Sequence, residues 1–336
     1  MSQDGTGLQA DHPPTKQPTI YDVARAAGVS HQTVSRLLKG DPGIKPANRE
    51  RVLKALDELQ YRPNLTARSL ATSRSHRVVA LTQEITQVGP GKVAKGASEE
   101  ARANGYVLDI IALDVGDRAN IEAAIKLVNQ QDVAGILALA STDELHDAFE
   151  STTFHVPVVI PFEEDPRSDA MAELVGHLVE FGHRRFLHLA GPVGWASARN
   201  RLRDIEEALG ARGLELGGVV HGDWSPKSGY DAVRALGPEL PYTAVLAAND
   251  QMAIGAILAL ADRGLRVPED VSVTGMDDIP EAAYLRPPLT TIRLGLEEEG
   301  RKTFRRLLTL MTGEQTELRP TPAQVVVRRS TGAAPR

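Results

Sequence analysis

The sequence contains no cysteine among its 336 residues, and only 4% of them are aromatic. Without cysteine the chain can form neither a disulfide framework nor a thiolate metal site. No apolar run approaches the length needed to cross a bilayer, and the first residues lack the basic-then-apolar layout of a secretory signal. These absences favour a cytoplasmic globular protein with no membrane partner.

Motifs of common catalytic classes are also missing. Residues 89–92 (GPGK) partly match the phosphate-binding loop G-x-x-x-x-G-K-[ST]. Position 86 is Thr where the loop requires its first Gly, and position 93 is Val where it requires Ser or Thr. The sequence has no G-x-S-x-G nucleophile elbow and no H-E-x-x-H zinc motif. His183 and His188 are five residues apart, off a common helix face, and His188 falls in an apolar run, which favours a structural role. The sequence therefore predicts no enzyme, no cofactor and no metal site.

Length and charge indicate more than one domain. A chain of 336 residues has room for two or three. Residues 1–77 hold 12 Lys and Arg against 7 Asp and Glu, whereas the remainder holds 26 against 37. A basic head on an acidic body fits a nucleic-acid-binding module joined to a domain that does not touch phosphate. Residues 1–18, rich in Gln, Asp, Pro, Gly and Thr, are expected to be a disordered leader.

Residues 19–39 (TIYDVARAAGVSHQTVSRLLK) have the pattern of two short helices joined by a tight turn. Thr19 and Asp22 are spaced as the halves of a capping box, and Gly28 permits the positive φ of a sharp helix exit. Ser30 is placed to cap a second helix, running to about Leu38. The apolar stripes are expected to comprise Val23, Ala24 and Ala27 on the first helix and Val34, Leu37 and Leu38 on the second.

The second helix has a polar side suited to a DNA major groove. Its donors and acceptors are His31, Gln32, Thr33, Ser35 and Arg36. An ordinary helical hairpin could also expose such a face. The segment resembles the head of the LacI/GalR family of bacterial repressors, which reads T-x-x-D-V-A-x-x-A-G-V-S-x-x-T-V-S-R; every fixed letter is present between Thr19 and Arg36.

The resemblance implies that this head binds a double-stranded DNA operator. The side chains implied to read base edges are His31, Gln32 and Arg36. Those implied to contact phosphate or to position the helix are Tyr21, Ser30, Thr33 and Ser35. Thr19 and Asn64 complete the expected DNA-binding set in this part of the chain.

A third helix and a hinge are expected after the head's first two helices. Pro46 would begin a helix whose apolar positions, Val52, Leu53, Leu56 and Leu59, close a three-helix core. Lys45 replaces the family's usual hydroxyl residue before this proline, so a capping side chain is missing. Residues 64–71 (NLTARSLA) resemble the family's hinge, which implies that two copies fold in the minor groove of the operator, where Ala67 and Leu70 would sit.

From residue 78 onward, short apolar runs alternate with amphipathic stretches. The runs predict strands at 78–82, 107–112, 135–139, 156–160, 186–190, 244–247 and 272–276. The stretches predict helices near 92–104, 120–130, 170–181, 197–212, 228–236 and 250–263. This alternation is typical of parallel sheets with helices on both faces. Two groups, split near residue 161, suggest two similar subdomains with a ligand cleft at the carboxyl ends of their strands.

The predicted fold class is therefore α/β, with a small all-α helix-turn-helix head followed by two parallel-sheet subdomains. The expected domains are a head at 19–63, a hinge and linker at 64–77, a two-lobed body at 78–330 and a tail at 331–336. In the body the family resemblance continues to about residue 328. It is carried by EFGHRR (180–185), LAGP (189–192), ANDQMAIG (248–255), VPEDVSVTGMDD (267–278) and PPLTTIR (287–293).

The body's resemblance implies a fold of periplasmic-binding-protein type, reused as an effector sensor that dimerises. Where the local motifs match, Arg201 would donate to sugar hydroxyls, Asn249 would supply an amide and Asp277 would accept paired hydroxyl hydrogen bonds. Trp224 would offer a flat face to the apolar side of a sugar ring. Planar polar groups with one aromatic plate suit a polyhydroxylated ligand. Asn249 could instead cap its helix, and Trp224 and Trp195 could be core residues.

Two stretches depart from the family pattern. The crossover at 162–171 is about nine residues shorter than the family's usual one, so Asp169 aligns with a ligand-contacting acid only if the gap precedes it. Leu294 replaces a polar residue that commonly follows PLTTIR or PLTTIK. Glu84 and the loop at 87–92, which includes Pro90, resemble family members that respond to β-linked sugars.

The combined hypothesis is a homodimeric repressor of carbohydrate genes that a sugar effector releases from a palindromic operator. The favoured effector is a β-linked mono- or disaccharide. The same scaffold could instead respond to a corepressor or a non-sugar metabolite. Two alternatives from other classes are a cytoplasmic sugar-binding protein without regulatory DNA binding, and a sugar-processing enzyme. The enzyme would require a carboxylate pair at catalytic spacing, which the sequence does not reveal.

Overall fold

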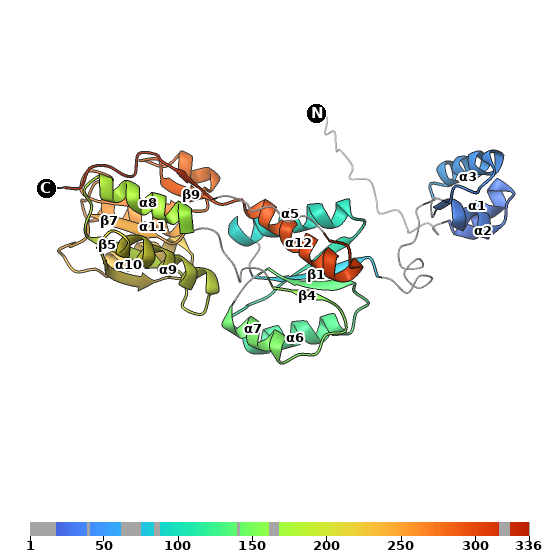
Figure 1. Ribbon diagram of the computed structural model, residues 1–336, viewed down its shortest axis with the longest axis horizontal. Helices are drawn as coiled ribbons and strands as arrows, with labels where there is room; N and C mark the ends of the chain where they lie inside the picture. Colours follow the sequence, from blue (N-terminus) through green and yellow to red (C-terminus); the bar gives the residue numbers. More distant parts are fainter. Residues whose placement is uncertain are drawn as a thin grey trace, which may run out of the picture. The chain divides into compact units, whose positions relative to one another are not determined.

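The computed structural model describes residues 18–38, 41–61, 75–83, 88–139, 142–160, 168–315 and 323–335. The chain divides into two compact units, residues 1–74 and 75–336 (Figure 1). None of the helices in the described ranges combines the length and apolar character needed to span a bilayer.

The first unit is a three-helix head. Its helices are α1 (Ile20–Ala27), α2 (His31–Leu38) and α3 (Pro46–Glu58). The capping box at α1 is confirmed: the Asp22 amide donates to Thr19 Oγ1 at 3.3 Å, and the Thr19 amide donates to Asp22 Oδ2 at 2.9 Å. Gly28 ends α1 with φ of +62°, as expected. Lys45 makes no side-chain cap at α3, also as expected.

The small core of the head follows helical spacing more strictly than predicted. Val34 and Leu37 are buried, but Leu38, the last residue of α2, is 37% exposed and does not belong to the core. In α3 the buried stripe comprises Val52 and Ala55. The prediction for Leu53 is wrong: it is 54% exposed, because one residue of offset rotates a side chain by about 100° away from the stripe.

The second unit begins with a lobe built on a parallel sheet, in the order β2-β1-β3-β4. These strands are β1 (Arg77–Thr82), β2 (Val107–Ala112), β3 (Gly135–Ala138) and β4 (Val158–Val159). One face is covered by α5 (Val88–Ala103) and α12 (Leu296–Thr312), the other by α6 (Arg118–Asn129) and α7 (Asp143–Glu150) (Figure 1). Successive side chains of β1 point to opposite faces of the sheet. Val78 and Ala80 therefore pack in the apolar cluster with α5, whereas Val79 and Leu81 pack in the cluster with α6.

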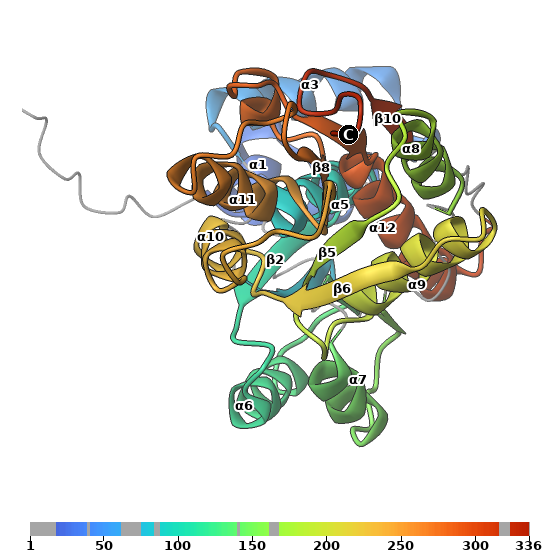
Figure 2. The ribbon, with the colours of Figure 1, turned by 90° about the vertical axis from the view of Figure 1, so that its left-hand side faces the viewer.

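The C-terminal lobe contains a second sheet, in the order β10-β9-β8-β7-β5-β6. Its strands are β5 (Phe186–Ala190), β6 (Leu216–His221), β7 (Ala244–Ala247), β8 (Ser272–Met276), β9 (Thr290–Arg293) and β10 (Gln324–Val326). Only the β9–β10 pair is antiparallel. Helices α8 (Ser168–Glu180) and α9 (Ala196–Gly210) lie on one side of the sheet, and α10 (Pro226–Arg234) and α11 (Asp250–Asp262) on the other (Figure 2).

Every predicted strand and helix of the body is present, with ends within a few residues. The elements not predicted from the sequence are the edge strands β6 and β10, the short strand β9, the helices α7 and α12 and the 3-10 helix η1 (Pro280–Ala283). The division near residue 161 is incomplete, because α12 follows β9 of the C-terminal lobe yet packs on α5 of the N-terminal lobe. The chain then returns to the C-terminal lobe as β10. It therefore passes between the lobes three times.

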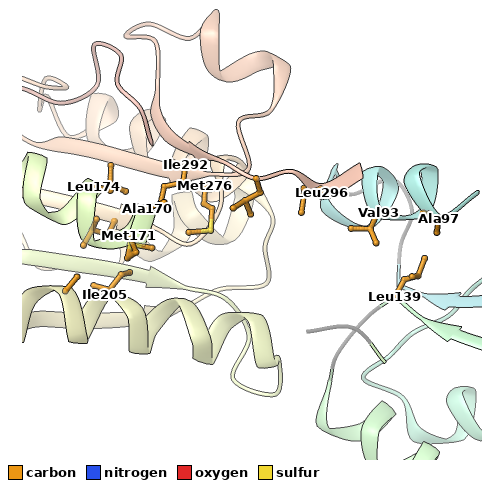
Figure 3. Close-up of a cluster of buried hydrophobic side chains, with 14 of the residues drawn as sticks. Val93, Ala97, Leu139, Ala170, Met171, Leu174, Ile205, Met276, Ile292 and Leu296 are labelled. Atoms are coloured by element: carbon orange, nitrogen blue, oxygen red, sulfur yellow. The ribbon is translucent and has the colours of Figure 1, made fainter. Parts of the chain in front are cut away.

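The second of these passages is buried in a shared apolar cluster. Met276 and Ile292 belong to the C-terminal sheet, Leu296 begins α12, and Val93 and Ala97 lie on α5 (Figure 3). All five side chains are part of one cluster of buried residues. The passage from β9 to α12 is consequently packed apolar structure.

Helices α5 and α12 touch through their backbones. A methyl group at Gly96 would lie 1.8 Å from the Glu297 carbonyl oxygen, and one at Gly300 would lie 2.0 Å from the Val93 carbonyl oxygen. Only glycine permits this approach. Ion pairs flank the crossing: Lys95–Glu297 at 2.8 Å, Arg301–Glu99 at 2.6 Å and Arg305–Glu100 at 2.9 Å.

Gly300→Ala is expected to destabilise the body, because the methyl group meets a backbone carbonyl that cannot rotate away. Overpacking of this kind costs about 1–3 kcal/mol of unfolding free energy. Gly89→Ala is the matched control, because Gly89 lies in α5 and a methyl group added there would meet no heavy atom within 4 Å. Urea unfolding of both variants tests the crossing; equal midpoints would contradict the close approach.

Candidate functional sites

The polar face of α2 is exposed as predicted. His31, Gln32 and Arg36 are exposed, whereas Thr33 and Ser35 are half-buried. Tyr21 of α1 is 61% exposed, and its ring centroid lies 5.2 Å from that of His31. The two helices therefore present one continuous polar and aromatic surface.

Two hydroxyl groups at the start of α2 are engaged with each other. The Thr33 amide donates to Ser30 Oγ at 3.3 Å, and the two hydroxyl oxygens are 3.0 Å apart. Ser30 thus fulfils the predicted capping role. These bonds leave both hydroxyls with spare lone pairs or protons for a further partner.

Arg36 is held at its Nε by an acid that the sequence reading did not identify. Arg36 Nε donates to Asp41 Oδ2 at 2.7 Å, and the Gly43 amide donates to Asp41 Oδ1 at 2.7 Å. Hydrogen bonds from Arg36 and Gly43 hold the pKa of Asp41 below its ordinary value. Because the pair uses Nε, the two terminal nitrogens still provide the fork that guanine recognition requires. The hinge candidates Asn64, Ala67 and Leu70 lie outside the described residues.

In the C-terminal lobe the structure gathers four predicted residues into one group, the Arg201 cluster: Arg201, Trp224, Asn249 and Asp277. Arg201 reaches Asp277 Oδ1 with a terminal nitrogen at 3.4 Å and donates to the Ala248 carbonyl oxygen. Both charged residues are more than nine-tenths buried. Desolvating such a pair is costly, and additional hydrogen bonds offset the cost.

Trp224 forms the apolar side of this cluster. Its ring lies 5.2 Å from the Arg201 guanidinium carbon, and it meets the Trp195 ring edge-on at 5.9 Å. A methyl group at Gly191 would lie 2.2 Å from the Trp224 ring, so the ring rests directly on that backbone. Trp224 is 6% exposed, and its indole nitrogen is buried without a hydrogen-bond partner among the described residues.

Asn249 caps α11 and also orders the cluster. The Met252 amide donates to Asn249 Oδ1 at 2.8 Å, and Asn249 Nδ2 donates to the Trp224 carbonyl oxygen at 3.0 Å. The capping interpretation is therefore correct. One amide proton and one oxygen lone pair remain for a ligand.

The backbone is strained where the cluster lies. Among the described residues other than glycine, only Gln60, Trp224, Asp277 and Asp278 have positive φ; Trp224 is at +72° and Asp277 at +109°. Such conformations cost about 1–3 kcal/mol each and persist where the surroundings enforce them. The strain is concentrated at the residues expected to bind the effector.

His188 lies buried on β5 and is neutral. Its Nδ1 is 2.8 Å from the Leu246 carbonyl oxygen, and burial lowers its pKa to about 4. A neutral ring adds no positive charge near Arg201. The structural interpretation of His188 and His183 is supported, because His183 is bonded to Thr243 and Ser272 across the sheet.

The N-terminal lobe reaches this region through residues that the sequence reading did not select. Thr142 forms an isolated β-bridge with Trp195, and the Asp143 amide donates to the Gly194 carbonyl oxygen at 3.0 Å. Arg199 of α9 binds both carboxylate oxygens of Asp143, at 2.8 and 2.9 Å. These contacts join the two lobes beside Trp195.

At the end of β1, Thr82 Oγ1 and Gln83 Oε1 are buried without a hydrogen-bond partner among the described residues. Polar atoms of this kind usually find a partner, and a ligand can supply one. The available sequence signal was a polar side chain at the carboxyl end of a parallel strand, with Thr82 as its last residue and Gln83 directly after it.

Two further predicted effector residues lie near helix starts, outside the Arg201 cluster. Pro90 lies in the first turn of α5, and Asp169 is exposed in the first turn of α8. Glu84 lies outside the described residues. Leu294 is 7% exposed and belongs to the apolar cluster around Ile292 and Leu296.

Comparisons with known proteins agree with both units. The family model described as "Bacterial regulatory proteins, lacI family" matches residues 19–64, and that described as "Periplasmic binding protein-like domain" matches residues 175–331. The lactose operon repressor of Escherichia coli (strain K12) is 33% identical over 334 residues, covering 95% of this chain and 92% of the relative.

Two solved structures are similar over nearly the whole chain. The lac repressor dimer bound to operator and the anti-inducer ONPF has a TM-score of 0.84 at 32% identity, covering 95% of this chain and 100% of that one. The transcriptional regulator CelR–cellobiose complex has a TM-score of 0.68 at 30% identity, covering 93% and 99%. The chain therefore belongs to the LacI family of bacterial regulatory proteins, and it is a DNA-binding transcriptional repressor of that family rather than an enzyme.

Proposed function

We propose that this repressor controls carbohydrate genes and that a β-linked mono- or disaccharide, held by the Arg201 cluster, releases it from a palindromic operator. The observation that carries this proposal is the cluster itself: a buried guanidinium and carboxylate beside an indole ring, on a strained backbone. Sugars need paired planar polar groups and an apolar plate. The similarity to a regulator in complex with cellobiose supports the β-linked class.

At the operator, each head of a homodimer would read one half-site. His31, Gln32 and Arg36 contact base edges, because they are the exposed polar side chains of α2. Tyr21, Ser30, Thr33 and Ser35 contact phosphate or position the helix, with Thr19 ordering α1. Asn64, Ala67 and Leu70 belong to the hinge at 64–71, which enters the minor groove.

At the effector site, the sugar would lie between the Arg201 cluster and the N-terminal lobe. Asp277 accepts hydroxyl protons, Arg201 donates, Asn249 offers its second amide proton, and Trp224 faces the apolar side of the ring. Glu84, Pro90 and Asp169 are the proposed contacts outside the cluster. A sugar that binds both lobes changes how they meet at Thr142 and Trp195, and thereby shifts the population of operator-binding dimers.

Arg36→Ala is expected to weaken operator binding, because it removes a bidentate base contact worth about 1–3 kcal/mol from each head. A duplex selected from a palindromic random library serves as the probe in a gel-shift titration. Lys54→Ala is the control: Lys54 is 74% exposed on α3 and carries the same charge. Equal affinity of the two variants would contradict base reading by Arg36.

Asp277→Ala is expected to yield a repressor that binds the operator normally and is not released by sugar. The loss follows because Arg201 is deprived of the Asp277 carboxylate and the sugar loses its acceptor. The measurement is operator affinity with and without cellobiose or lactose. Asp231→Ala on α10, where Asp231 pairs with Lys227 on the surface, is the control. Normal release of the Asp277 variant would contradict the site; tightening by sugar in the parent protein would reverse the proposed polarity.

The same measurements separate the other classes. A sugar-binding protein without regulatory DNA binding would bind cellobiose or lactose but would select no duplex from the library. A sugar-processing enzyme would convert the sugar, which chromatography of the incubated mixture detects. Selection of a palindrome together with recovery of unchanged sugar is the expected result.

A further inference from the structure

The backbone that carries Asp277 turns through two left-handed residues in succession. Asp277 has φ of +109° and Asp278 has φ of +47°. Neither residue is glycine, so the turn is held by its surroundings. The Asp277 amide donates to the Ile292 carbonyl oxygen at 2.8 Å, which fixes the start of the turn to β9.

Asp278 is fixed by two cations. Arg293 Nε donates to Asp278 Oδ2 at 2.6 Å, and an Arg328 terminal nitrogen donates to Asp278 Oδ1 at 2.6 Å. These hydrogen bonds, opposed by partial burial, hold the pKa of Asp278 below its ordinary value. The Asp278 side chain is therefore anchored to β9 and to the segment after β10.

The end of the turn is fixed by a carboxylate from another element. The Ile279 amide donates to Asp250 Oδ2 at 2.8 Å, and Thr291 Oγ1 donates to Asp250 Oδ1 at 2.5 Å. Asp250 is fully buried at the start of α11 and forms no ion pair among the described residues. A methyl group at Gly275 would lie 2.1 Å from Asp250 Oδ1, so a glycine at this position of β8 leaves room for the Asp250 side chain.

We propose that Asp250 is a positioning residue for the effector: by holding the Ile279 amide and the Thr291 hydroxyl, it keeps the 277–279 turn in the conformation that presents the Asp277 carboxylate to Arg201 and the sugar. The inference rests on the proposed role of Asp277. Asp250 itself does not touch the sugar; it acts only through the turn that carries Asp277.

The charge around Asp250 makes this position sensitive to pH. The acids that face it are Asp277 and Asp278; Asp277 is paired with Arg201, and Asp278 with Arg293 and Arg328. Burial, reinforced by the charge of Asp277, raises the pKa of Asp250 to about 7. The ionised carboxylate accepts from both the Ile279 amide and the Thr291 hydroxyl, whereas a protonated carboxyl accepts more weakly and holds the turn less firmly. Sugar affinity is therefore expected to rise as pH rises from about 6 to about 8, across this pKa.

Hydrogen exchange of the full-length protein without sugar tests the positioning directly. Asp250→Ala removes the acceptor, and the protection of the Ile279 amide is expected to fall about tenfold or more, as for loss of a hydrogen bond to a charged group. Asp250→Asn retains an oxygen acceptor and is expected to restore protection to within about threefold. Asp270→Asn, a surface carboxylate paired with Arg266 in the same lobe, is the control. Unchanged Ile279 protection in a folded Asp250→Ala protein would overturn the proposal.

Titration with cellobiose over the same pH range completes the test. The parent protein should gain affinity as pH rises, and Asp250→Asn should show a flat profile. If Asp250→Ala does not fold, Thr291→Val replaces it as the test. This variant removes one hydrogen bond that stabilises ionised Asp250, so the midpoint of the pH profile should move to higher pH. An unmoved midpoint would overturn the proposal. If cellobiose binds neither the parent nor Asp277→Ala, the proposed effector class fails, while the exchange result still decides the role of Asp250.

Discussion

The contact between the Arg201 guanidinium and the ends of the C-terminal strands is the interaction on which the rest depends. Arg201 comes from α9, yet it bonds to the Ala248 carbonyl after β7 and to Asp277 after β8, and it lies beside the Trp224 ring. A buried cation that contacts three separate loops is expensive to desolvate, and its hydrogen bonds to the Ala248 carbonyl and to Asp277 offset part of that cost.

For sugar binding at the Arg201 cluster to change operator affinity at the head, the two lobes of the body must be coupled. The chain passes between them three times, and the passage from β9 to α12 is packed in the cluster that includes Ile292, Leu296 and Val93. Helix α12 in turn meets α5 backbone to backbone at Gly96 and Gly300. Because close-packed interfaces have few alternative arrangements, a change at the strand ends is expected to move α12 and α5 together.

The local signals in the sequence were the most dependable. The capping pair Thr19–Asp22, the exit at Gly28 and the buried strand runs predicted elements that the structure contains. Strand β6 was missed because only alternate residues are half-buried and Gly217 and Gly218 lower the apolar signal. The return of α12 to the first lobe is a long-range event, and no local pattern encodes it.

The candidate site was predicted in its residue types but not in its geometry. Motif matches brought together Arg201, Trp224, Asn249 and Asp277, and the structure places them in contact. Left-handed backbone at Trp224, Asp277 and Asp278 could not be predicted from the sequence, because only a few per cent of residues other than glycine adopt it. The Arg36–Asp41 and Arg199–Asp143 pairs were equally inaccessible, since each depends on how separate turns fold back.

Sugar and operator are proposed to bind the same dimer, each lowering its affinity for the other. Measuring the affinity of the full-length dimer for cellobiose, with and without saturating operator duplex, tests that claim most directly. Linkage requires the operator to weaken sugar binding by the factor through which sugar weakens operator binding, typically about 5–150-fold. That matched reduction is the predicted result. Identical sugar affinity in free and operator-bound protein would contradict the account.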